Sequence, residues 1–212
     1  QALEEREREL LHLGRVARGA QAIDDVVGAR VVAGGAGRAR AVVGVGAIPN
    51  DALAVAAGLD VEGGILVDLE ARTSDPAIFA IGDVTRRPMP IYGRMFRMES
   101  VPNALEQAKQ AAAVLTGRPA PAGETPWQWS DQYDLKLQIA GYPFDSDRIV
   151  VRGDPATASF AVFHLSGDRV QAVEAINAPP EFMMGRKLIG ERRAVDVAKL
   201  ADKAVSMKEV GV

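Results

Sequence analysis

The segment best suited to bind a sugar or a polyol is a short apolar run that ends in glycine and aspartate. Residues 78–81 (Ile-Phe-Ala-Ile) predict a strand, and Gly82 and Asp83 follow it directly. Ligands of open α/β sheets bind at the carboxyl ends of the strands. Gly82 permits close approach of a ligand to the backbone, and the Asp83 carboxylate can accept hydrogen bonds from hydroxyl groups. The spacing alone fits an ordinary Gly-Asp turn equally well.

A second glycine-rich stretch, residues 34–40, invites comparison with a dinucleotide-binding turn. Its sequence is Gly-Gly-Ala-Gly-Arg-Ala-Arg, and Arg40 stands where the third small residue of the Gly-x-Gly-x-x-Gly fingerprint is needed. That position must be small because helix and strand pack closely there, and no convincing helical pattern follows. The stretch therefore predicts a flexible loop.

The sequence contains no cysteine, which excludes thiolate metal ligands, iron–sulfur ligation, disulfides and dithiol catalysis within this chain. Its two histidines, His12 and His164, cannot form a metal cage alone. His164 lies in a strand-like run, so we expect a solvent-facing or hydrogen-bonded strand residue rather than a ligand or a base. Any redox chemistry must come from a bound cofactor.

The bulk properties are those of a soluble globular protein. The chain has 212 residues, enough for one or two domains, and a net charge of −3, which argues neither for nucleic acid nor for a membrane surface, so neither is expected as a partner. No apolar run approaches the roughly 20 residues of a membrane span, and the start does not match a signal peptide. A cytoplasmic location is therefore expected.

The part of the sequence up to residue 118 has the alternation of strands, turns and helices that is typical of an α/β domain. Residues 41–46 form a continuous apolar run, typical of a buried parallel strand. Residues 102–116 predict a helix with a proline in its first turn and Gly117 at its end. Its apolar positions are Leu105, Ala108, Ala112 and Leu115. The other expected elements are helices at 2–13 and 51–57, the second N-capped by Asn50, and strands at 29–33, 64–68 and 78–81.

The part after residue 118 has a different texture. A Pro- and Gly-containing stretch at 118–124 predicts a linker. Strands are expected at 135–140, 148–152, 159–165 and 169–176, with a hairpin turn at 166–168, and helices at 180–190 and 195–208. Strands followed by helices indicate a small α+β domain.

Four ordered motifs resemble those of FAD-dependent pyridine-nucleotide oxidoreductases, the two-dinucleotide-fold flavoprotein reductases. Thr73 and the Ala-x-Gly-Asp run at 80–83 resemble the second FAD-binding motif. The Gly-x-x-Pro-Asn run at 46–50 resembles the return from the NAD domain to the FAD domain, and Glu-Ser-Val-Pro-Asn-Ala at 99–104 resembles the start of the helix that meets the flavin pyrimidine ring. Trp-Ser-Asp-Gln at 129–132 resembles ferredoxin reductases that serve aromatic-ring dioxygenases and cytochromes P450.

The resemblance implies a role for six residues at an FAD site. Asp83, with Gly82, would contact the ribityl hydroxyls. Val101 and Pro102 begin a helix whose free N–H groups would face the N1/C2-oxygen edge of the flavin, where a helix N-terminus favours the reduced anion. Trp129 would shield the isoalloxazine, and Glu99 is a candidate for contact with the nicotinamide of NAD(P)H.

Plainer interpretations remain open for several of these residues. Trp127 and Trp129 lie two positions apart and so share one face of an extended segment, where both could simply cover a core. Glu99 could be a solvated charge. The arginines of the 86–97 region could steer an acidic ferredoxin or could be ordinary surface charges. This local positive cluster consists of Arg86, Arg87, Arg94 and Arg97.

The expected organisation is a poorly matching remnant of the NAD-binding region at 1–41, the C-terminal part of an FAD-binding domain at 42–118, and a C-terminal reductase domain at 119–212. Neither Gly-x-Gly-x-x-Gly fingerprint of the resembled family is present, so we expect a truncated chain; an altered reading frame upstream is one hypothesis for residues 1–41.

The function that the resemblance implies is transfer of hydride from NAD(P)H to FAD and of single electrons to a [2Fe–2S] ferredoxin. The alternative is a non-enzymatic fragment or interface module, for which a homodimer is one arrangement.

Overall fold

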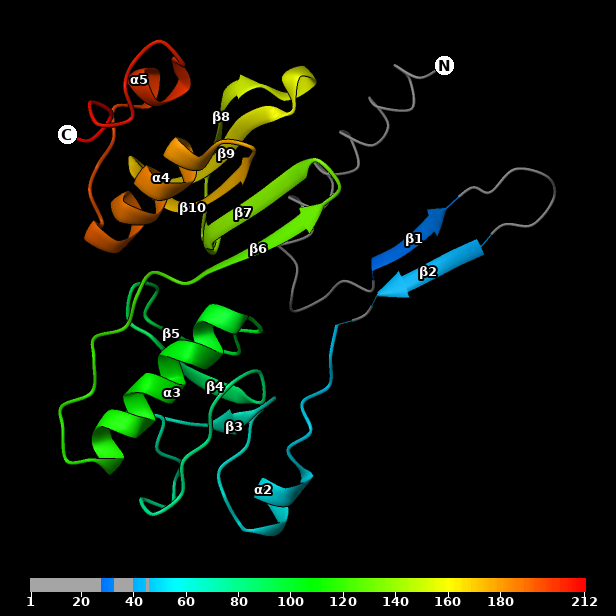
Figure 1. Ribbon diagram of the computed structural model, residues 1–212, viewed down its shortest axis with the longest axis vertical. Helices are drawn as coiled ribbons and strands as arrows, with labels where there is room; N and C mark the ends of the chain where they lie inside the picture. Colours follow the sequence, from blue (N-terminus) through cyan, green and yellow to red (C-terminus); the bar gives the residue numbers. More distant parts are fainter. Residues whose placement is uncertain (1–27, 33–39, 45) are drawn as a thin grey trace. The chain divides into compact units, whose positions relative to one another are not determined.

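The computed structural model describes residues 28–32, 40–44 and 46–212, in two compact units that divide between residues 48 and 49 (Figure 1). In the first unit, β1 (Gly28–Val32) pairs antiparallel with β2 (Arg40–Gly44), and Gly28 lies opposite Gly44. The expectation of a parallel strand at 41–46 is therefore wrong. Strands that follow one another after a short connection pair antiparallel, because a parallel pair needs a long crossover. The predicted helix at 2–13, His12 and the glycine-rich loop lie outside the described residues.

The first half of the second unit is a small three-stranded sheet with a long helix (Figure 1). β3 (Ile65–Leu66) pairs parallel with β4 (Thr85–Met89), which pairs antiparallel with β5 (Arg94–Phe96). The helix α2 (Ala52–Ala56) has Asp51 at its N-cap instead of the expected Asn50. β4 and β5 were not predicted, since their sequences contain several arginines and a proline.

The predicted strand at 78–81 is wrong. This segment makes a single bridge, between Arg72 and Phe79, and Ile78 and Ile81 are both exposed. No described strand lies alongside to take the remaining backbone hydrogen bonds. The apolar run therefore approaches Gly82 as an extended segment outside the sheet.

The helix α3 (Val101–Leu115) confirms the expected helix, but its buried face differs from the prediction. Ser100 is the N-cap, and its hydroxyl accepts a hydrogen bond from the Asn103 N–H at 3.3 Å. Two of the predicted apolar positions, Leu105 and Leu115, are 56% and 67% exposed. The buried side chains of α3 are Asn103, Gln107, Gln110 and Ala111. The helix thus turns a polar stripe inward.

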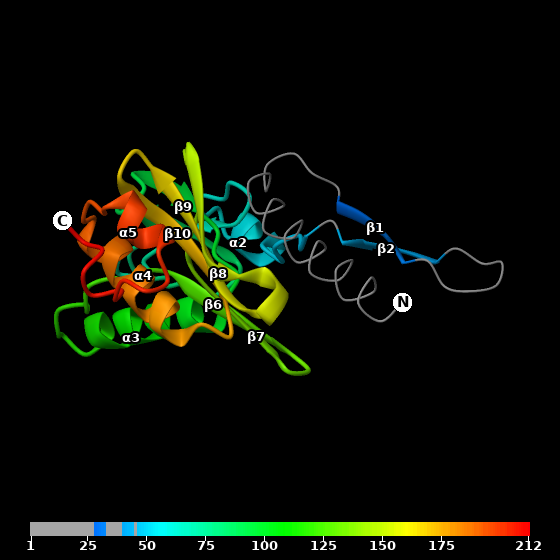
Figure 2. The same ribbon diagram turned by 90° about the horizontal axis from the view of Figure 1, so that it is seen from above.

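The second half of this unit is an antiparallel sheet in the order β6-β7-β10-β9-β8. The strands are β6 (Trp127–Gln132), β7 (Leu135–Gly141), β8 (Arg148–Asp154), β9 (Ser159–Ser166) and β10 (Arg169–Ile176), with a 3-10 turn at Pro155–Thr157. The four predicted strands and the 166–168 hairpin are confirmed; β6 was not predicted. The helix α4 (Pro179–Glu191) packs on one face of the sheet (Figure 2) and buries Phe182, Leu188 and Ile189 against it.

The last predicted helix is shorter than expected. It forms only over α5 (Val197–Ala201), where the Asp196 carboxylate caps the N–H groups of Ala198 and Lys199. Beyond it, the buried Arg152 guanidinium donates to the carbonyls of Asp202 and Val205, both at 2.6 Å. A side chain that satisfies these carbonyls removes the need for another helical turn. The chain therefore leaves the helix and packs along β8.

A tyrosine joins the two halves of the second unit. Tyr92, in the turn between β4 and β5, donates its hydroxyl hydrogen to the Gln171 carbonyl at 2.7 Å and accepts from the Tyr142 N–H at 2.8 Å. Gln171 lies at a bulge of β10, which frees its carbonyl from the ladder. The rings of Tyr92, Phe96, Tyr142 and Phe144 pack edge to face or stacked at this junction. The C-terminal sheet is thus fixed to the β4–β5 hairpin.

Candidate functional site

The Gly82–Asp83 turn presents a carboxylate that the protein leaves unengaged. Gly82 has a φ of +82°, a conformation that favours glycine, and its backbone is held on both sides by α3 and β4 side chains. Asp83 is exposed, and its carbonyl accepts from Arg97 at 3.3 Å. Its carboxylate makes no hydrogen bond or ion pair with the residues that the structure describes. It is therefore available to accept hydrogen bonds from hydroxyl groups of a ligand.

The N-terminus of α3 lies beside this turn. A Cβ built on Gly82 would lie 3.9 Å from the Ala104 Cβ, in the first turn of the helix. Val101 is exposed, and its backbone N–H has no hydrogen-bond partner among residues 46–212. A helix of this length presents partial positive charge at its first turn, so the site favours a negatively charged or electron-rich edge of a ligand. The sequence placed these segments 18 residues apart, and the fold brings them together.

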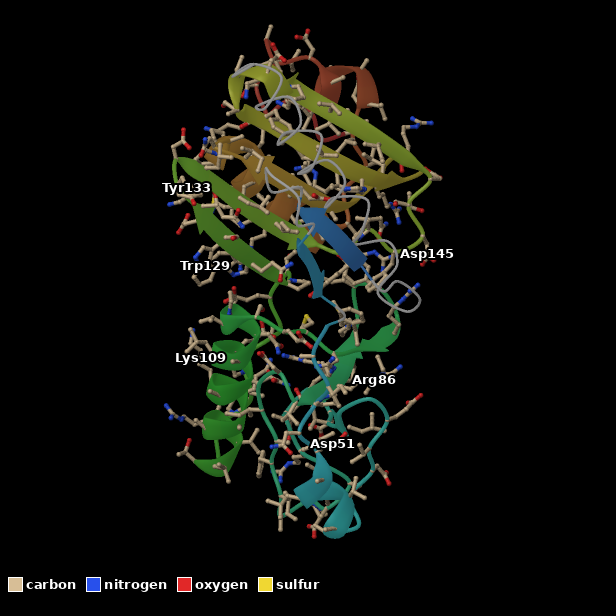
Figure 3. All side chains as sticks on the ribbon, turned by 90° about the vertical axis from the view of Figure 1, so that its right-hand side faces the viewer. Asp51, Arg86, Lys109, Trp129, Tyr133 and Asp145 are labelled. Carbon is tan, nitrogen blue, oxygen red and sulfur yellow. The ribbon has the colours of Figure 1, made fainter. Side chains whose placement is uncertain are left out.

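A groove of about 260 Å³ begins at this end of α3 and extends to β6. Val101, Pro102, Trp127 and Trp129 line it, and Figure 3 shows Trp129 beside the start of the helix. Gly82 and Asp83 do not line this groove. The fold thus places Trp129 next to Val101 and Pro102, and Asp83 next to the same helix on another side.

The two tryptophans differ in what they contact and in how far they are exposed. Their rings stack with centroids 5.3 Å apart, and Trp127 also packs on Phe182 of α4 at 5.8 Å. Trp129 remains 44% exposed at the groove. Trp127 therefore covers the core, as the plainer interpretation expected of both, while Trp129 has a free face that a planar ring could contact.

The remaining charged candidates are already paired. Glu99 forms an ion pair with Arg97. Arg94 pairs with Asp145, and Arg86 lies 3.5 Å from a Glu62 carboxylate oxygen. The four arginines therefore do not form one exposed positive cluster, because each has an acidic partner, and Arg87 is buried.

The buried Arg87 belongs to a polar network between β4 and α3 that was not predicted from the sequence. Its guanidinium pairs with Glu106 at 3.0 Å and donates to Gln110 at 3.2 Å and to Asn103 at 3.4 Å. Asn103, Gln107 and Gln110 follow one another at helical spacing of four and three residues, so they share one face. That spacing of amides was the available signal, and the apolar residues of the same helix concealed it.

His164 is a satisfied core residue. It is buried, and its Nε2 lies 2.7 Å from a carboxylate oxygen of Glu174 on the neighbouring strand. Within the described residues, no group of three or more His, Asp or Glu side chains could hold a metal ion. The longest helix there, α3, has 15 residues, so none of these helices could cross a bilayer.

The donor set at the α3 end fits part of a flavin. A free carboxylate suits a ribityl chain, the unpaired Val101 N–H at the start of α3 suits the pyrimidine edge, and an exposed tryptophan face suits the fused rings. The described residues offer no glycine-rich turn at a helix start for a pyrophosphate. The fit therefore covers the flavin half of FAD.

Comparison with known proteins gives the class. The model of the pyridine nucleotide-disulphide oxidoreductase family matches residues 12–108, and the model of the reductase C-terminal domain matches residues 127–211. The chain belongs to the pyridine nucleotide-disulphide oxidoreductases that carry this C-terminal domain. It combines part of a Rossmann-like FAD/NAD domain with the antiparallel C-terminal sheet, as the sequence predicted.

Within that class, the chain is homologous to ferredoxin reductases. It is 57% identical over 173 residues to a probable ferredoxin reductase, CtmF, of Castellaniella defragrans, a match that covers 81% of this chain and 42% of the relative. It is 47% identical to the ferredoxin–NAD(+) reductase component of the anthranilate 1,2-dioxygenase system of Burkholderia cepacia, covering 79% of this chain and 41% of the relative.

A solved structure gives the same result. The covalent putidaredoxin reductase–putidaredoxin complex superposes with a TM-score of 0.73 at 47% identity, over 76% of this chain and 39% of the other. The chain thus spans about two fifths of the length of these relatives.

Proposed function

We propose that this chain forms the flavin-facing end and the C-terminal domain of an FAD-dependent NAD(P)H:ferredoxin oxidoreductase. The observation that carries the proposal is the exposed, unpaired Asp83 carboxylate, held beside the free N-terminus of α3. Homology to ferredoxin reductases supports the assignment.

Each candidate residue then has a physical task. Asp83 would accept hydrogen bonds from the ribityl hydroxyls, and Gly82 would allow the chain to approach closely. The Val101 N–H and the partial positive charge of α3 would stabilise negative charge on the flavin, while Pro102 fixes the first turn of the helix. Trp129 would shield the ring system from water. Glu99 is proposed to contact the nicotinamide of NAD(P)H. Because Glu99 is paired with Arg97, the nicotinamide would have to bind beside this ion pair or displace Arg97 from it.

The reaction proposed for the whole protein is electron transfer from NAD(P)H to a [2Fe–2S] ferredoxin. When bound, FAD supplies the chemistry that converts a two-electron hydride donor into two single-electron transfers. The chain's own residues orient the flavin, hold its negative charge and exclude water. The putidaredoxin complex of a relative supports a ferredoxin as the partner.

Titration of the purified chain with FAD, followed by flavin fluorescence and absorbance, tests the proposal. Asp83→Ala should weaken FAD binding by about tenfold or more, because hydrogen bonds to a charged group contribute about 1.5–3 kcal/mol. Asp134→Ala, at the exposed β6–β7 turn, is the matched control and should bind as the wild type does. Equal affinity of the two variants would refute the role of Asp83.

The second candidate is a non-enzymatic fragment or interface module. If the purified chain, offered excess FAD, retains no yellow chromophore and oxidises no NAD(P)H, this second function stands and the reductase proposal fails.

A further inference from the structure

One buried side chain connects the two elements to which we assign flavin contacts. Gln107 lies on the inward stripe of α3 and is fully buried. Its Oε1 accepts the Gly82 N–H at 2.7 Å. Its Nε2 donates to the Thr85 hydroxyl at 2.9 Å, and that hydroxyl donates to the Gly82 carbonyl at 2.8 Å.

These three hydrogen bonds form a closed circuit. The directions that close it are Gly82 N–H to Gln107, Gln107 to Thr85, and Thr85 back to the Gly82 carbonyl, and the Thr85 hydroxyl also lies 3.1 Å from the Gln107 Oε1. The circuit fixes which end of the Gln107 amide faces Gly82, because only the oxygen can accept there. Both peptide groups of a glycine in the left-handed region are thereby held, and with them the direction in which Asp83 leaves the turn.

We propose that Gln107 is a positioning residue for flavin binding, which sets the Gly82–Asp83 turn relative to the N-terminus of α3. The inference rests on the proposed function. Gln107 touches no ligand itself; it acts through the Gly82 peptide. A leucine would fill a similar volume and leave the part-buried Gly82 N–H without an acceptor, while the Thr85 hydroxyl would keep the Gly82 carbonyl as its partner. An N–H left unpaired in this way costs more than the hydrogen bond itself contributes.

The chain offers a matched control one turn further along the same stripe. Gln110 is also buried on α3, but its amide joins Arg87, Glu106 and the Pro121 carbonyl and has no bond to Gly82. Gln107→Leu and Gln110→Leu therefore both remove a buried amide from the same helix. A merely structural role of Gln107 would give the two variants the same phenotype.

The experiment measures two quantities in the full chain: hydrogen exchange of the Gly82 amide by NMR, and the affinity for FAD. In Gln107→Leu we expect the Gly82 amide to exchange at least about tenfold faster and FAD to bind about tenfold more weakly. In Gln110→Leu both should stay near the wild-type values, although both variants lose stability.

The outcomes are distinguishable. Unchanged Gly82 exchange in Gln107→Leu, or equal loss of FAD affinity in both leucine variants, overturns the positioning role. Failure of the wild-type chain to bind FAD overturns the proposed function, and with it the flavin part of this inference, while the exchange rates still decide whether Gln107 holds the turn.

Discussion

Removal of the Tyr92 hydroxyl tests how the two halves of the 49–212 unit are held together. In Tyr92→Phe the ring and its contacts with Phe96, Tyr142 and Phe144 remain possible, but two hydrogen bonds disappear. The Gln171 carbonyl and the Tyr142 N–H then lose a partner at a position where the wild-type hydroxyl lies 2.7 Å and 2.8 Å from them.

The magnitude follows from the burial of the junction. A net hydrogen bond contributes about 1 kcal/mol, and a buried group left unpaired costs about 1–3 kcal/mol, of which the lower part of the range applies to these part-buried groups. We therefore expect Tyr92→Phe to lower the free energy of unfolding by about 3 kcal/mol. For a unit of this size that corresponds to a fall in melting temperature of roughly 6–12 °C.

The assay is urea unfolding followed by tryptophan fluorescence, since both tryptophans of the sequence, Trp127 and Trp129, lie on β6. Tyr133→Phe is the matched control, because Tyr133 is fully exposed at the β6–β7 turn. Its effect should stay within about 0.5 kcal/mol. A loss below about 0.5 kcal/mol in Tyr92→Phe would refute the argument that this hydroxyl joins the halves.

High pH probes the same junction. Burial raises the pKa of Tyr92 well above its usual value and, together with the nearby Glu99 charge, raises that of Tyr142 to about 12. The unfolded chain therefore loses tyrosine protons first, at about pH 10. The contribution of these two tyrosines to the free energy of unfolding should be fully present below that pH and should decrease as the pH rises towards their pKa values in the folded state. The decrease should be shallower in Tyr92→Phe.

Three further predictions concern stability. Gly141→Ala should cost more than about 3 kcal/mol in the same urea assay, because the new Cβ would lie 2.2 Å from the Gln171 carbonyl at a φ of +73°. Ser100→Ala should cost about 1 kcal/mol by removing the α3 N-cap, and an unchanged unfolding midpoint would contradict that cap. Burial raises the pKa of Glu181, but Lys203 and Arg152 outweigh it and hold the pKa below its usual value. Stability should therefore fall as the pH drops below about 4.5, and the fall should be shallower in Glu181→Gln.

Local sequence patterns were sufficient to predict a strand or a helix where the element has its own apolar pattern or its own capping residues. The strands after residue 135 alternate or run apolar between turn residues, and the structure confirms them. The α3 boundaries follow from Pro102 and Gly117. β4 was missed because Arg87 is buried by partners on another element, which no local pattern records.

Residue types and their spacing were sufficient to establish the order of the motifs, the cofactor class of the family that they resemble and the absence of cysteine chemistry. Which residues share a site follows from the fold, which brings Gly82 beside Ala104 and Trp129 beside Pro102, and which buries Arg87. The reason is physical. The periodicity of apolar residues indicates which side chains become buried, whereas the hydrogen-bond partners of buried polar groups come from distant segments of the chain. Only the folded chain brings the Gln107 amide to Gly82, 25 residues before it.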